Sequence, residues 1–125
     1  MAPEDMAYAG LGAGGLEAAL RAHGLQVEDA GNLAGPPNPG LPGGHGLRHL
    51  GEVVAWNRAV FDAVDAALGQ ERFPLLMGGD HCLAIGSISA VARHCRRAGR
   101  TLRVLWLDAH TDVNTESISP SGNLH

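Results

Sequence analysis

Asp108, His110 and Asp112 are the residues whose types and spacing point most directly to chemistry. They follow the apolar run Leu102–Leu107, and an extended backbone turns residues two apart to the same face. Two carboxylates around one imidazole suit a hard divalent cation such as Mn²⁺. If the strand continues through this segment, the three side chains converge at its tip, which is where open parallel sheets bind ligands.

A second polar group follows the apolar run Phe73–Met77. Gly78 and Gly79 permit a sharp turn, and His81 comes just after them. His81 would then stand at the same edge of the sheet as Asp108, so that two neighbouring strands build one metal site. The alternative for Asp108, His110 and Asp112 is a polar loop whose side chains satisfy backbone groups. The alternative for His81 alone is a hydrogen-bonded structural histidine.

The elements that must position these residues alternate along the chain. Hydrophobic spacing and stop signals predict helices over residues 14–23, 47–68 and 83–94. Short apolar or alternating runs predict strands over residues 25–29, 73–77 and 102–107. The Gly- and Pro-rich stretch 31–46 predicts a loop. This alternation is typical of the α/β class with a parallel sheet, and such a sheet seldom ends at three strands.

Composition narrows the possible partners. The 125 residues are 45% hydrophobic and 18% charged, enough for one globular domain with a core. The net charge of -4 and the lack of a basic stripe argue against nucleic acid. No signal peptide or membrane span is visible, so Cys82 and Cys95 are expected to be reduced in a cytoplasmic protein. Zinc is a weak alternative, because the cysteines lack paired spacing.

Three motifs, in order and at family-like spacing, resemble the arginase family of binuclear manganese ureohydrolases: Gly-Gly-Asp-His (78–81), Asp-Ala-His-Thr-Asp-Val-Asn (108–114) and Ser-Gly-Asn-Leu-His (121–125). The resemblance covers nearly all of the chain. It implies a three-layer α/β/α fold with a doubly wound parallel sheet. Residues 1–125 would be the N-terminal part of a single such domain, truncated at the C-terminus.

The resemblance also implies roles for single residues. The expected ligands of two Mn²⁺ ions are His81, Asp108, His110 and Asp112, with Asp108 bridging both ions. The expected contacts to the amino-acid end of the substrate are Asn114, Ser121 and Asn123. His125 matches the histidine assigned to proton transfer at the mouth of the active site. Taken alone, the segment 121–123 reads equally well as a surface turn.

The activity implied is hydrolysis of the guanidinium group of L-arginine to ornithine and urea by the full-length protein. The alternatives are agmatine or another guanidino substrate, or a non-catalytic fragment. The family completes its metal site with a later Asp-x-Asp pair, so we expect weak or no Mn²⁺ binding and negligible turnover from residues 1–125 alone. The resemblance further implies a cytoplasmic homo-oligomer, a trimer or hexamer, with a small-molecule substrate and neither nucleic acid nor membrane as partner.

Overall fold

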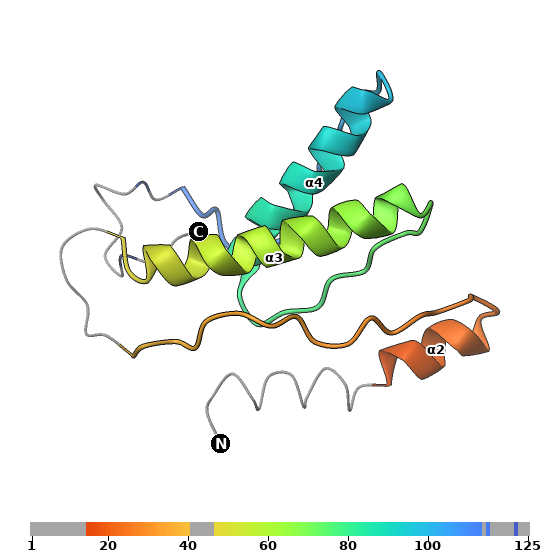
Figure 1. The fold of residues 1–125 in the computed structure, drawn as a ribbon, viewed down its shortest axis with the longest axis horizontal. Helices are drawn as coiled ribbons and strands as arrows, with labels where there is room; N and C mark the ends of the chain where they lie inside the picture. Colours follow the sequence, from red (N-terminus) through yellow and green to blue (C-terminus); the bar gives the residue numbers. More distant parts are fainter. Residues whose placement is uncertain (1–14, 41–46, 114, 116–121, 123–125) are drawn as a thin grey trace. The chain divides into compact units, whose positions relative to one another are not determined.

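The computed structural model of the chain describes residues 15–40, 47–113, 115 and 122. Within these residues the elements are α2 (Leu16–Ala22), α3 (Leu50–Gly69), the 3₁₀ helix η1 (His81–Leu83) and α4 (Ala84–Arg97), as shown in Figure 1. The chain divides into two compact units. The first is Met1–Leu33 with Leu75–Asp80, and the second is Ala34–Pro74 with His81–His125.

Helix α2 belongs to the first unit and forms from local preferences. Its residues are Leu, Glu, Ala and Arg, all good helix formers. The exposed side chains of Glu17 and Arg21, one turn apart, form an ion pair at 2.8 Å. The helix stops just before Gly24, whose φ of +80° is the left-handed conformation that commonly ends helices. The helix predicted over residues 14–23 is therefore confirmed for Leu16–Ala22, and residue 14 lies outside the described residues.

Helix α3 is the longest element among the described residues. Its 20 residues bury Asn57, Val60 and Val64, which recur three and four residues apart and therefore share one face. The predicted helix over 47–68 is confirmed, although it begins at Leu50 rather than at residue 47. Neither α3 nor any other helix in the described part of the chain is long and apolar enough to cross a membrane.

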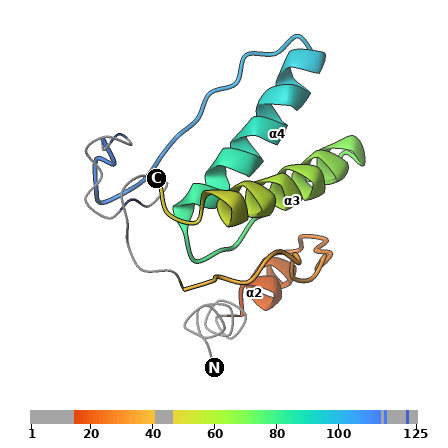
Figure 2. The same ribbon diagram turned by 60° about the vertical axis from the view of Figure 1, so that its left-hand side comes forward.

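Helix α4 packs against α3 within the second unit. The Gly86 amide donates a hydrogen bond to Asn57 at 2.7 Å, and the Arg93 guanidinium donates one to Asp65 at 2.9 Å. These contacts occur in the same order along both helices, so the two helices run in the same general direction. Ala90 between them is fully buried, and a side chain this small lets the helices approach closely. Figures 1 and 2 show the N-terminal end of α4 lying against α3.

The predicted strands are not present in the described residues. Neither 25–29, 73–77 nor 102–107 has strand structure. Phe73 and Leu107 leave 91% and 86% of their surface exposed. A parallel strand is stabilised by hydrogen bonds to neighbouring strands and by cover on both faces, and the described residues supply neither. The prediction of these three strands was therefore wrong for the described part of the chain, and the structure does not confirm the doubly wound sheet.

Candidate metal centre

The second unit brings residues 81 and 108 together because the chain returns past α4. The 14 residues of α4 rise about 21 Å. The segment from Arg100 to Asp108 can reach about 26 Å when extended, which is enough to return to the start of the helix. Figure 2 shows this segment passing back beside α4. The rings of His81 and Trp106 then meet edge to face, with centroids 5.9 Å apart.

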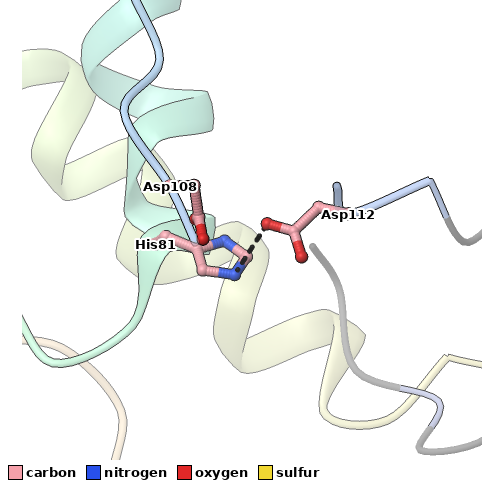
Figure 3. A group of neighbouring side chains, drawn as sticks. All are labelled: His81, Asp108 and Asp112. Atoms are coloured by element: carbon pink, nitrogen blue, oxygen red, sulfur yellow. Dashed lines mark ion pairs between the residues drawn. The ribbon is translucent and has the colours of Figure 1, made fainter. Parts of the chain in front are cut away.

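His81, Asp108 and Asp112 form a group that has the composition of a cation site. Each offers one ligand atom, and these atoms all lie within 4.8 Å of one another. Figure 3 shows both carboxylates close to the imidazole, with Nε2 of His81 3.5 Å from Oδ2 of Asp112. All three side chains are partly exposed, so an ion can reach them. One imidazole nitrogen and two carboxylate oxygens suit Mn²⁺ among the divalent ions, so the residues present fit the metal that the sequence predicts.

Hydrogen bonds hold Asp108 in its ionised form. The backbone N–H of His110 donates to Oδ1 at 2.9 Å, and the indole N–H of Trp106 donates to Oδ2 at 3.3 Å. The His110 amide is the main reason that the pKa of Asp108 lies below its ordinary value of 3.8, and it outweighs the opposing effect of desolvation. The Trp106 indole and the charges of His110 and His81 lower the pKa of Asp108 further. At neutral pH the group is a carboxylate, as a cation ligand must be.

His110, which the sequence predicts to converge with both aspartates, contacts Asp108 but is not among the three residues whose ligand atoms lie close together. Its side chain is 82% exposed, and its Nδ1 lies 3.4 Å from Oδ1 of Asp108. The expected convergence assumed an extended strand. Instead the His110 amide folds back onto the Asp108 carboxylate, a local turn typical of aspartate. Asp112 then adopts a left-handed conformation with φ of +45°, so the alternation of side chains is lost.

The remaining predicted site residues lie outside the described residues. These are the expected substrate contacts Asn114, Ser121 and Asn123 and the expected proton-transfer residue His125. Their roles stay predictions from the sequence.

Trp106 is a site residue that the sequence reasoning missed. A tryptophan in the apolar run 102–107 is most simply a core residue, but 47% of the surface of Trp106 is exposed. Its indole contacts both the His81 ring and the Asp108 carboxylate. The available signal was its position two residues before Asp108, where side chains of an extended segment share a face.

The imidazole and carboxylate group thus places the chain in the class of proteins with a candidate divalent-cation site. Comparison with known proteins is more specific, because the Arginase family model matches residues 1–125. The chain therefore belongs to the arginase family.

Curated relatives agree with this assignment. The chain is 42% identical over 127 residues to a protein named arginase from Bacillus caldovelox, covering 100% of this chain and 40% of that protein. It is 41% identical over 114 residues to the Brucella melitensis arginase, covering 90% of this chain and 37% of the relative. The chain thus spans about 40% of the length of these relatives. No solved structure matches it.

Proposed function

We propose that this chain contributes to the active site of a manganese-dependent hydrolase that converts L-arginine to ornithine and urea. The observation that carries the proposal is the group of His81, Asp108 and Asp112 in a chain of the arginase family. The relatives named arginase support arginine as the substrate.

In this proposal His81, Asp108 and Asp112 would hold one Mn²⁺ ion, and His110 would be a ligand of a second one shared with Asp108. The chemistry that the metal would supply is a lowered pKa of water, and hence a nucleophile for the poorly electrophilic guanidinium carbon. The hydrogen bonds from His110 and Trp106 keep the Asp108 carboxylate ionised and fix its orientation. Binding by His110 requires its exposed imidazole to turn toward the group.

The substrate contacts in the proposal rest on the family resemblance. The neutral donors Asn114, Ser121 and Asn123 bind the α-carboxylate and α-amino end of arginine by hydrogen bonds, which fixes the remote guanidinium over the metal site. His125 gives the leaving amine its proton, since the ordinary pKa of histidine lies close to neutral pH. We also propose that the complete enzyme is cytoplasmic and forms a homo-oligomer, a trimer or a hexamer.

The test is urea release in the presence of Mn²⁺, measured with arginine and with agmatine. If the reading frame continues past residue 125 in the genome, we expect a further Asp-x-Asp pair there and arginine as the preferred substrate of the complete product. Asp108→Asn and Asp112→Asn should each abolish turnover, because each removes an ionised ligand. Preference for agmatine would instead indicate an agmatinase. A complete product that releases no urea from either compound would refute the hydrolase proposal.

Residues 1–125 alone provide a separate test. They supply the ligands of about half of a two-metal site, so we expect weak Mn²⁺ binding and no measurable urea. Normal arginine hydrolysis by this chain would refute the half-site interpretation while leaving the reaction itself supported.

A further inference from the structure

Asn57 is a buried polar residue whose side-chain carboxamide both donates and accepts a hydrogen bond. It lies on the face of α3 that contacts α4, and only 8% of its surface is exposed. Its Nδ2 donates to the carbonyl of Val53 at 3.0 Å within α3, while its Oδ1 accepts the Gly86 amide of α4 at 2.7 Å. The first bond fixes the orientation of the carboxamide, so the oxygen is aimed at α4.

The bond to Gly86 caps α4 from a different helix. Gly86 is the third residue of α4, where backbone amides have no partner inside the helix. The residue at the N-cap position, Leu83, forms no side-chain cap. Leucine lacks the oxygen that serine, threonine or aspartate would provide at this position. Asn57 therefore supplies from α3 a cap that the local sequence does not.

This contact is close to the metal group along the chain. His81 begins η1, which leads directly into α4, so the capped Gly86 comes only five positions after His81. Cys82 between them is buried, which restricts η1 further. One turn of helix thus joins Gly86, which Asn57 holds, to His81, whose imidazole faces Asp112.

We propose that Asn57 is a positioning residue for His81. By fixing the N-terminus of α4 on α3, it sets where the His81 imidazole stands relative to Trp106, Asp108 and Asp112. The proposal rests on the proposed function only in assigning metal binding as the reason for this placement. The placement itself can be measured without metal.

The variant that isolates the contact is Asn57→Ser in the 125-residue chain. A serine hydroxyl can hydrogen-bond the carbonyl four residues earlier in its own helix, but it is too short to reach the Gly86 amide. Val64→Ala is the matched control, because Val64 is buried on the same helix and its truncation also leaves a small cavity. Asn57→Asp is the rescue, since it retains an acceptor oxygen for Gly86 and places a negative charge at a helix N-terminus.

Two measurements decide the proposal. The first is the nuclear Overhauser effect between the rings of His81 and Trp106, recorded without metal. The second is Mn²⁺ affinity, followed by paramagnetic broadening of the Trp106 indole signal. We expect Asn57→Ser to weaken the ring contact and to lower Mn²⁺ affinity about tenfold, the lower end of the range for residues that orient metal ligands. Val64→Ala should change neither measurement, and Asn57→Asp should retain the ring contact.

An unchanged ring contact in Asn57→Ser would overturn the proposal. So would an equal loss in Val64→Ala, because the effect would then be one of general stability. If the unmodified chain binds no Mn²⁺ while Asn57→Ser still loses the ring contact, the metal assignment fails and the positioning role stands. If the unmodified chain shows no contact between the two rings, the positioning proposal fails.

Discussion

Replacement of Gly86 by alanine tests the packing of α4 on α3 directly. A Cβ atom at this position would lie 2.4 Å from the backbone oxygen of Asn57 and 3.1 Å from its carbonyl carbon. These are atoms of a helix backbone and cannot rotate away as a flexible side chain could, so the helices must separate. Such overpacking costs about 1–3 kcal/mol. Loss of the hydrogen bond from Gly86 to Asn57 costs about 1 kcal/mol more.

Alanine also stabilises helices intrinsically. Replacing a helical glycine by alanine gains up to about 1 kcal/mol, which offsets the lost hydrogen bond. The net expectation for Gly86→Ala is therefore a destabilisation of about 1–3 kcal/mol, dominated by the clash. Denaturation followed by circular dichroism measures it.

The matched control is Gly51→Ala. Gly51 also lies in the first turn of a helix, but a Cβ there would meet nothing within 4 Å. We expect this variant to be unchanged or stabilised by up to about 1 kcal/mol. If Gly86→Ala proved as stable as Gly51→Ala, the close contact between the helices, and with it the cap from Asn57, would be refuted.

Two further variants test the second unit. The hydrogen bond from Arg93 lowers the pKa of Asp65 in the folded protein below its ordinary value of 3.8. The ionised Asp65 therefore stabilises the fold above pH 3.8, and this stabilisation is lost as the pH falls through the lowered pKa. Asp65→Asn should therefore weaken the decline of melting temperature as the pH falls below about 4, and an unchanged decline would contradict this. Trp56→Phe removes the indole hydrogen bond to the Pro36 carbonyl at 2.9 Å. Its loss, about 1 kcal/mol, should speed proteolysis near Pro36 about fivefold, and equal cleavage rates would show that the bond does not hold this segment.

The helices could be predicted because their determinants are local. Apolar residues three and four apart define the buried face of α3, and Gly24 marks the end of α2. The boundaries moved by a few residues. Helix α4 runs on to Arg97, beyond the predicted end at His94, because no residue before Gly99 favours leaving the helix.

The strands could not be predicted in the same way, because a strand depends on its neighbours. The runs 73–77 and 102–107 have the apolar composition of buried strands, yet composition cannot supply the partner that forms the hydrogen bonds. The same dependence explains the position of His110. Its expected alignment with Asp108 and Asp112 followed from a strand that the described residues do not contain.

The cap formed by Asn57 was also beyond sequence reasoning, for a different reason. An asparagine inside a helical pattern is unremarkable, and its partner Gly86 lies 29 residues away. Only the structure shows that a long-range contact replaces the missing local cap. Gly86 carried a weak signal, since a glycine near the start of a helix lowers helix stability unless close packing requires it.

Two adjacent residues of η1 have different roles, one in packing and one in the candidate metal site. His81 is partly exposed and faces the carboxylates, while Cys82 is 7% exposed and packs inward. The resemblance leads us to expect serine or threonine at position 82. A buried thiol behaves as a small apolar group and needs no strong hydrogen-bond partner, so cysteine can fill this place without the desolvation cost of a hydroxyl. Cysteine is therefore compatible with the inward packing of η1 at this position.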